Sequence, residues 1–226
     1  MFITLEGIEG SGKSTQILHM SDFLKKAGLR CAVTREPGGT VIGRKIRSIL
    51  LDPDSTLIEP GTELLLYAAD RVQHIREVIL PLIQAGNVVI CDRYFDATLA
   101  YQGYARGLDT TFIRTLHHLT CQDLKPDLTI LLDLSPDIGL ARAWKQLEAG
   151  CRSGAESRFE KETLAFHERV RAGYLKLAAA EPDRFKIVDA SPNEPQVQKQ
   201  IIEVLKTDSR LFTDSSLQKP GNMHYV

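Results

Sequence analysis

An eight-residue segment near the amino terminus has the residue types of a phosphate-binding loop. It reads Gly7-Ile8-Glu9-Gly10-Ser11-Gly12-Lys13-Ser14, between the apolar run 1–5 and a helix-like stretch from Thr15. Its glycines let the backbone curl with N–H groups pointing inward, and the following helix adds its positive dipole end. In such a loop, called a P-loop, the lysine reaches the β- and γ-phosphates and the serine hydroxyl can bind magnesium. The segment predicts an ATP or GTP site with Mg²⁺.

Two classes of nucleotide-binding protein do not fit the rest of the chain. No Asn-Lys-x-Asp segment, the guanine signature of GTPases, occurs in the sequence. An ATPase motor or transporter normally needs more than the 226 residues present. A small kinase with two phosphate-bearing substrates remains.

Composition limits the partners and the compartment. The chain has 43% hydrophobic and 25% charged residues, and its formal net charge is −1. This balance gives no global attraction to nucleic acid or to membrane surfaces, so we expect neither as a partner. The four cysteines form no close-spaced pair, and the start of the chain does not read as a signal peptide. We expect a cytoplasmic protein with reduced thiols.

The elements that must position the P-loop alternate along the chain. Apolar runs predict five strands, at 1–5, 30–34, 88–92, 127–133 and 185–189. Helical patterns lie between them, at 15–26, about 40–50, 59–85 with a break or kink at Pro81, 110–121, 137–147, 157–180 and 194–205. This alternation predicts an α/β fold, a five-stranded parallel sheet flanked by helices. In such sheets the site lies beyond the carboxyl ends of the strands.

Charged residues gather at those predicted strand ends. They are Glu6, Arg35-Glu36, Asp92-Arg93, Asp133 and Asp189. Asp92 is the better candidate for the carboxylate that supports magnesium beside Ser14, and Asp133 is its competitor. For either residue the alternative is a helix N-cap or a structural ion pair.

Several further segments resemble the signature blocks of the bacterial thymidylate kinase family, in its order and at its spacings. The blocks are Thr34-Arg35-Glu36-Pro37-Gly38-Gly39-Thr40, Leu66-Tyr67-Ala68-Ala69-Asp70-Arg71, Asp92-Arg93-Tyr94, Thr98-Leu99-Ala100-Tyr101-Gln102-Gly103, and the pair 158–160 and 166–174. The resemblance covers about residues 1–206. It implies a single P-loop nucleoside monophosphate kinase domain over 1–206 with a lid at about 144–157, followed by a flexible extension at 207–226.

The resemblance also implies the reaction and the acceptor site. ATP would transfer its γ-phosphoryl group to dTMP, giving dTDP and ADP in dTTP biosynthesis. Arg93 resembles the arginine that binds the acceptor phosphate, Arg71 the arginine of the base pocket, Tyr67 the aromatic that stacks on the base, and Tyr101 the tyrosine under the deoxyribose. The acceptor-site residues are expected to be Glu36, Pro37, Tyr67, Arg71, Arg93, Thr98, Tyr101 and Gln102, with Thr98 and Gln102 hydrogen-bonding the acceptor or its base.

The remaining implied roles concern the P-loop and the lid. Glu9 matches an acid that contacts the acceptor sugar or the magnesium shell, and a solvent-facing loop acid is the alternative. The P-loop lacks the arginine that some family members carry, so lid arginines must neutralise the transition state. Arg152 and Arg158 are expected to contact phosphates and Arg142 to pack near the adenine, although each could be a solvated helix charge. The residues expected to bind ATP are Gly7, Ile8, Glu9, Gly10, Ser11, Gly12, Lys13, Ser14, Thr15 and Arg142, and those expected to act in catalysis are Lys13, Glu9, Arg93, Arg152 and Arg158.

Two other interpretations stay open. One is a nucleoside monophosphate kinase for a different base, and the other is a nucleotide sensor that transfers nothing. The resemblance further implies a homodimer that uses helices near 40–80 and 110–122.

Overall fold

A single parallel sheet forms the centre of the computed structural model, which describes residues 1–55, 58–150 and 154–212. Its five strands lie in the order β2-β3-β1-β4-β5, with every neighbouring pair parallel. They are β1 (Phe2–Glu6), β2 (Cys31–Arg35), β3 (Val88–Asp92), β4 (Leu128–Asp133) and β5 (Phe185–Asp189). The predicted fold class and all five predicted strands are confirmed.

The register of the sheet brings the charged strand ends to one edge. Asp92 pairs with Leu5 of β1 and with Arg35 of β2, and Asp133 pairs with Asp189 of β5. The central strands β1 and β4 are buried along nearly their whole length, because neighbours cover both faces. The edge strands β2 and β5 are only partly buried. The acidic and basic groups therefore meet beyond the carboxyl ends, as expected.

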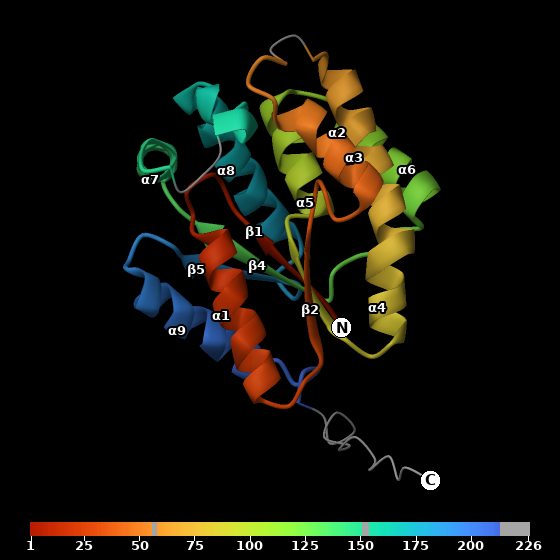
Figure 1. The fold of residues 1–226 in the computed structure, drawn as a ribbon, viewed down its shortest axis with the longest axis vertical. Helices are drawn as coiled ribbons and strands as arrows, with labels where there is room; N and C mark the ends of the chain where they lie inside the picture. The colour runs from red at the N-terminus through yellow and green to blue at the C-terminus, as the bar shows by residue number, and fades with distance from the viewer. Residues whose placement is uncertain (56–57, 151–153, 213–226) are drawn as a thin grey trace.

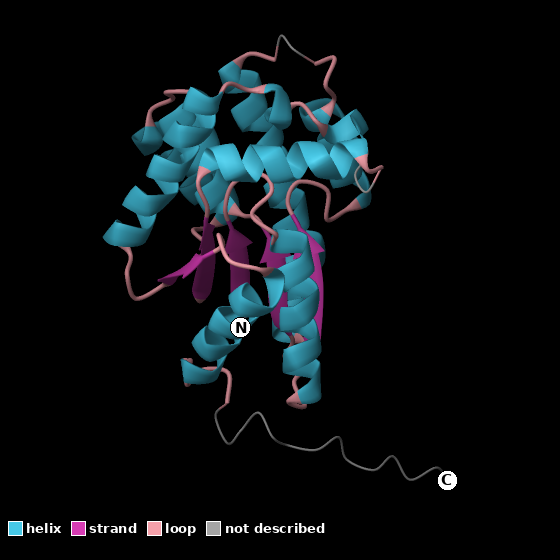
Figure 2. Ribbon diagram, turned by 90° about the vertical axis from the view of Figure 1, so that its left-hand side faces the viewer, coloured by secondary structure: helices cyan, strands magenta, loops and turns pink. Residues whose placement is uncertain are grey.

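Helices cover both faces of the sheet and crowd around its carboxyl edge (Figures 1 and 2). They are α1 (Lys13–Lys26), α2 (Val41–Leu51), α3 (Pro60–His74), α4 (Leu80–Gln84), α5 (Phe95–Thr98), α6 (Thr110–Cys121), α7 (Pro136–Glu148), α8 (Leu164–Ala180) and α9 (Glu194–Thr207). Two π-helical segments, Ile75–Ile79 and Leu99–Ala105, continue α3 and α5, and short 3₁₀ turns lie at Gly154–Glu156 and Phe159–Lys161.

Two helical predictions differ from the structure, and one helical stretch was not predicted. The helix predicted over 59–85 does not end at Pro81, because the π-helical turn before it changes the hydrogen-bond register and the Leu80 N–H donates to Ile75 O. The helix predicted from Ser157 begins only at Leu164, where the Thr163 side chain caps it. The helical stretch from Phe95 to Ala105 was not predicted as an element.

The end of the chain packs further than expected. Leu211 is buried, and the Phe212 ring meets the Phe23 ring of α1 edge-on at 6.4 Å. The first residues of the predicted extension 207–226 therefore belong to the packed part of the molecule. Residues 213–226, on which the rest of that prediction falls, lie outside the described residues.

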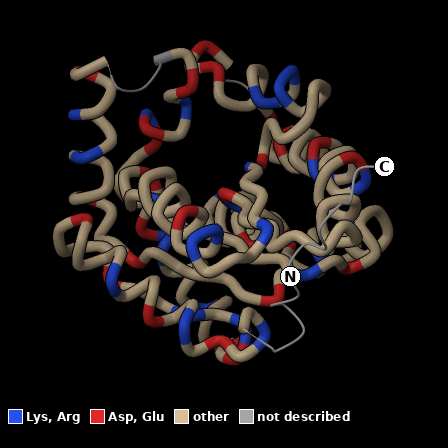
Figure 3. Tube along the Cα trace, turned by 60° about the horizontal axis from the view of Figure 1, so that its bottom comes forward, with Lys and Arg blue, Asp and Glu red and all other residues tan. Residues whose placement is uncertain are grey.

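Charges of both signs are interspersed along the trace (Figure 3). No helix in the described part of the chain has the length and apolar character needed to cross a membrane.

Candidate active site

The P-loop adopts a backbone that requires glycine. Gly7, Gly10 and Gly12 have φ angles of 142°, 69° and 91°, a region that favours residues without a Cβ. A Cβ on Gly10 would lie 1.9 Å from the Gly139 carbonyl oxygen of α7, so a side chain there cannot fit. The loop is thereby held against α7. It leads directly into α1, where Ser14 and Thr15, which follow the buried Lys13, are exposed.

The Lys13 side chain lies folded against its own loop. Its Nζ donates to Gly7 O at 2.9 Å and to Ile8 O at 2.8 Å. Burial, together with the positive charge of Arg93, lowers the pKa of Lys13 to about 8. These bonds place an ammonium group at the loop, where an incoming phosphate can replace the carbonyl oxygens as its partner.

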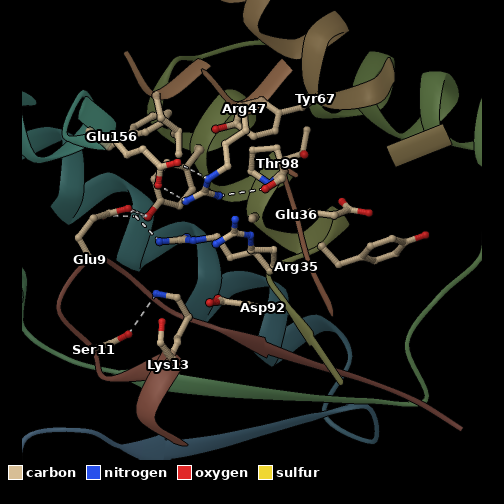
Figure 4. A pocket seen from close by; sticks show the side chains of 18 of the residues that line it. Glu9, Ser11, Lys13, Arg35, Glu36, Arg47, Tyr67, Asp92, Thr98 and Glu156 are labelled. Carbon is tan, nitrogen blue, oxygen red and sulfur yellow. Dashed lines mark hydrogen bonds and ion pairs between the residues drawn. The ribbon is translucent and has the colours of Figure 1, made fainter. Parts of the chain in front are cut away.

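A cavity of about 470 Å³ opens from the P-loop across the carboxyl edge of the sheet. Ser11, Lys13 and Asp92 lie at one end of it, and Tyr67 and Thr98 lie at the other (Figure 4). The predicted residues that line it are Glu9, Gly10, Ser11, Gly12, Lys13, Ser14, Thr15, Glu36, Pro37, Tyr67, Arg71, Asp92, Arg93, Thr98, Tyr101 and Gln102. The cavity thus joins the nucleotide loop to the set of residues expected at the acceptor site.

Arg93 occupies the middle of this arrangement in a strained backbone conformation. Its φ is 67°, which is unfavourable for a residue with a side chain, and its N–H donates to Leu5 O at 3.1 Å. The guanidinium donates to Glu9 Oε1 at 2.9 Å and to the Tyr174 hydroxyl at 3.3 Å. It also lies 4.9 Å from the centre of the Tyr101 ring. The fork is therefore fixed between the P-loop and α8.

Glu9 is a buried carboxylate surrounded by donors. The Tyr101 hydroxyl lies 2.7 and 2.9 Å from its two oxygens, and His167 Nδ1 lies 3.2 Å from Oε2. Burial acts to raise the pKa of Glu9, but the Arg93 charge, His167 and Lys13 together hold it well below its usual range. The Glu9 side chain is therefore ionised and points into the cavity rather than into solvent.

A second carboxylate, Glu36, orders the far end of the cavity. Its Oε2 accepts from Arg71 Nε at 2.9 Å, and its Oε1 lies 2.9 Å from His74 Nδ1. Arg71 in turn donates through Nη2 to Thr98 Oγ1 at 2.8 Å. All of these groups are buried, so the arginine and the threonine hydroxyl are held in fixed positions beside Tyr67.

Two of the three arginines expected to contact the phosphates or the adenine do not line the cavity. Arg158 does not line the cavity: it donates to Leu50 O and, at 2.5 Å, to Glu63 Oε2. Arg142 donates to Ala190 O and Ser191 O at 2.9 Å each and does not line the cavity either. Arg152 lies outside the described residues. In this arrangement Arg158 is a structural ion-pair partner, and its contact with phosphate stays a prediction.

The two candidate magnesium carboxylates have different surroundings. Asp133 makes a bidentate ion pair with Arg171, at 2.7 and 2.8 Å, which is the structural alternative considered for it. Asp92 lines the cavity, and its buried Oδ1 has no hydrogen-bond partner among the described residues. A buried oxygen without a partner, in the cavity that Ser14 also lines, suits a magnesium ion that takes most of its ligands from phosphates and water. Asp92 therefore fits a role in holding magnesium, and Asp133 does not.

Several cavity residues were not predicted as site residues. They are Arg35, Arg47, Leu51, Tyr94, Ala97, Gln146, Glu156, Phe159 and Glu160. Arg35 carried a signal, since it directly follows a predicted strand and stands beside Glu36. Arg47 donates to Glu156 at 2.9 and 2.8 Å and to Pro37 O at 2.9 Å, and its position on α2 gave no comparable signal.

Comparisons with known proteins agree with this geometry. The family model described as "Thymidylate kinase" matches residues 5–201. A thymidylate kinase of Desulforapulum autotrophicum is 58% identical over 202 residues, covering 89% of each chain. One of Desulfosudis oleivorans is 52% identical over 206 residues, covering 91% of this chain and 96% of the relative. A crystal structure of thymidylate kinase from Ehrlichia chaffeensis superposes with a TM-score of 0.71 at 32% identity, covering 91% of this chain and 98% of that one. The P-loop sheet that places Lys13, Arg93 and Arg71 around one cavity, and these matches, show that the chain belongs to the thymidylate kinase family.

Proposed function

We propose that this member of the thymidylate kinase family transfers the γ-phosphoryl group of ATP to dTMP within the single cavity described above. The observation that carries the proposal is the continuity of that cavity from the P-loop, past Arg93, to the recess of Tyr67, Arg71 and Thr98. A nucleotide phosphate at the loop and a monophosphate nucleotide in the recess would face each other across Arg93. The products are dTDP and ADP.

Catalysis at this site requires positioning and charge stabilisation rather than a general base. The acceptor phosphate is already ionised at neutral pH, so no side chain needs to remove a proton. Lys13 holds the β- and γ-phosphates, and the planar Arg93 fork binds the acceptor phosphate. Arg35 lines the same cavity and adds positive charge to it, whereas the charge of Arg47 is balanced by Glu156.

Magnesium completes the site as a bound ion of the nucleotide. The Ser14 hydroxyl and the Asp92 carboxylate would hold it, the latter directly or through water. When bound, Mg²⁺ supplies charge neutralisation on the β- and γ-phosphates. No group of three or more His, Cys, Asp or Glu side chains suited to a metal occurs in the described residues, which agrees with an ion held mainly by phosphates.

The roles proposed for the acceptor residues follow those expected from the sequence. Tyr67 stacks on the base, Arg71 and Thr98 hydrogen-bond it, and Tyr101 lies under the sugar, with its hydroxyl on Glu9. Glu9 is placed between Arg93 and Tyr101, where it can accept from the 3′-hydroxyl of the acceptor. Glu36 and Pro37 close this end of the cavity.

We further propose a cytoplasmic homodimer built from one P-loop kinase domain, with a lid at about 144–157, per chain. Helices α2, α3 and α6 lie on one side of the molecule (Figure 1), with α3 in contact with both others. Exposed apolar side chains on this side include Leu65, Phe112 and Leu119. Such a face supports association of two copies through the regions expected from the sequence.

Product identification tests the proposed reaction. The wild-type chain is incubated with ATP, magnesium and dTMP, and the products are separated by anion exchange. We expect equal amounts of dTDP and ADP, and their loss in Lys13→Ala and Arg93→Ala. ADP released without dTDP would mean hydrolysis in place of transfer.

A further inference from the structure

Glu63 of α3 is a fully buried carboxylate with three side-chain neighbours, Gln102, Arg106 and Arg158. Its Oε1 accepts from Gln102 Nε2 at 2.7 Å, and its Oε2 accepts from Arg158 Nη2 at 2.5 Å. Arg106 lies on both oxygens at 3.4 Å. A buried acid needs such compensation. Two arginines balance its charge, and the shortest contact of Oε1 is with the Gln102 amide.

The contact with Glu63 fixes which end of the Gln102 amide faces the cavity. An ionised carboxylate accepts hydrogen bonds and cannot donate them, so the group that meets Oε1 must be the Gln102 NH₂. The amide orientation is thus set by chemistry, whereas the two ends of an isolated amide are hard to tell apart. Gln102 is 1% exposed and lines the cavity, and its carbonyl oxygen has no hydrogen-bond partner among the described residues. The recess therefore contains a fixed acceptor.

The Thr98 hydroxyl, by contrast with the Gln102 carbonyl, is oriented as a hydrogen-bond donor. Arg71 donates through Nε to Glu36 Oε2 and through Nη2 to Thr98 Oγ1. Because this oxygen already accepts from a cation, the Thr98 hydroxyl proton is free to point into the cavity that Thr98 lines. Two buried carboxylates, Glu36 and Glu63, thereby impose a donor beside an acceptor on the wall of the recess.

The pattern matches one kind of pyrimidine edge. A thymine or uracil ring has a C4 carbonyl, which accepts, beside an N3–H, which donates. Cytosine has an amino group and an unprotonated N3 in the same places, so both hydrogen bonds would be reversed. We propose that Glu63 is a positioning residue for base selection, which holds the Gln102 amide oxygen toward the base and thereby favours a 4-oxo over a 4-amino pyrimidine. This inference rests on the proposed function of the cavity.

Replacing Glu63 by glutamine should reverse the pattern. Arg106 and Arg158 attract the single oxygen of the new amide, so its NH₂ turns toward Gln102. Gln102 must then rotate to accept, and its own NH₂ faces the base. A mismatched buried donor or acceptor changes an affinity by about ten- to a hundredfold.

The test compares turnover of dTMP and dCMP in four proteins: wild type, Glu63→Gln, Glu162→Gln and the double variant Glu63→Gln/Gln102→Glu. Glu162 pairs with Arg106 at 2.6 Å, so its variant removes a carboxylate from the same arginine without touching Gln102. We expect the ratio of kcat/KM for dTMP over dCMP to fall about ten- to a hundredfold in Glu63→Gln alone. In the double variant, the carboxylate introduced at position 102 would again present an acceptor, and the ratio should recover. An unchanged ratio in folded Glu63→Gln, or no recovery in the folded double variant, would overturn the inference.

A measurement on the wild type keeps the inference testable if the buried variants fail to fold. Glutamine labelled with ¹⁵N and ¹³C gives separate NMR signals for the Gln102 NH₂ and carbonyl. Addition of dTMP should shift the carbonyl carbon and leave the NH₂ protons protected by Glu63. A large shift of the NH₂ signals instead would overturn the inference. Failure of the wild type to phosphorylate dTMP would count against the proposed function, whereas these results concern Glu63 alone.

Discussion

Arg93 donates to the Glu9 carboxylate at 2.9 Å, so the cation expected to bind the acceptor phosphate is already paired with an acid of the P-loop. Burial acts to lower the pKa of Arg93, but the neighbouring Tyr101 and Glu9 raise it well above its ordinary value, and the guanidinium stays charged. The pair links the nucleotide loop to the acceptor site. An arriving phosphate would meet a guanidinium whose direction is already set.

The planar fork of Arg93 should matter more than its charge. Arg93→Lys keeps one positive charge but cannot contact Glu9, Tyr174 and a phosphate together. We expect KM for dTMP to rise about ten- to a hundredfold, with little change in melting temperature. Steady-state kinetics at saturating ATP measure this. Arg30→Lys, at an exposed arginine just before β2, is the matched control, and an equal effect in both variants would contradict the role of Arg93.

Binding of ATP should weaken at alkaline pH because Lys13 loses its proton. Its pKa is lowered from 10.5 to about 8 by burial and by Arg93, and only the ammonium form attracts phosphate. Below this pKa the affinity should be constant; above it the free lysine must take up a proton to bind, so Kd rises about tenfold per pH unit. Calorimetry from about pH 7 to about pH 9.5, in buffers of different ionisation enthalpy, checks this. A constant Kd without proton uptake would rule it out.

Magnesium dependence should separate Asp92 from Asp133. In Asp92→Asn we expect the Mg²⁺ concentration for half-maximal rate to rise about ten- to a hundredfold, because a carboxylate near the ion is lost. Asp133→Asn should leave that concentration unchanged, since Asp133 is committed to Arg171. Initial rates over a magnesium titration measure both. A shift in Asp133→Asn, with none in Asp92→Asn, would exchange the two assignments.

His117 should make the fold sensitive to mild acid. Burial, and secondly the Arg71 charge, lower the pKa of this α6 residue from 6.5 to about 4. A lowered folded-state pKa contributes stability that is present above pH 6.5 and is lost as the pH falls toward 4, because the unfolded chain binds the proton first. The loss should reach on the order of 2 kcal/mol near pH 5.

Denaturant unfolding at neutral and acid pH measures that loss. His117→Phe keeps a ring against Phe95, on which His117 stacks at 3.8 Å, and it should flatten the acid limb. Arg114→Lys, at an exposed position of the same helix, should leave the limb as in the wild type. If His117→Phe loses as much stability in acid as the wild type, another group is responsible.

Much of this fold could be predicted from local residue patterns. The strands are short apolar runs that begin and end at turns, and the P-loop is defined by glycine, lysine and serine at fixed spacing. The π-helical segments Ile75–Ile79 and Leu99–Ala105 could not be predicted this way, since their hydrogen-bond register depends on packing as well as on local sequence. The start of α8 shows the same limit. Its capping residue, Thr163, cannot be told from other threonines in the sequence without the helix that follows it.

Part of the site could likewise be predicted from the sequence, and part of it could not. Residues within the resembling blocks, such as Arg93 and Tyr101, do lie together around the cavity. Arg158 was predicted as a phosphate contact because a basic residue after a polar segment suggests a lid, but its partner Glu63 lies 95 positions earlier in the chain. Pairing of that kind depends on three-dimensional contacts, and no local pattern in the sequence revealed it.

The central claim is selective phosphorylation of dTMP, and a coupled ADP-release assay with a panel of monophosphates tests it most directly. The wild type would be given ATP, magnesium and each deoxy- and ribonucleoside monophosphate in turn, beside Lys13→Ala. We predict turnover of dTMP with kcat/KM at least about a hundredfold above that of dCMP and the purine monophosphates, and its loss in the variant. Higher kcat/KM with another monophosphate, or nucleotide binding without turnover of any acceptor, would contradict the account.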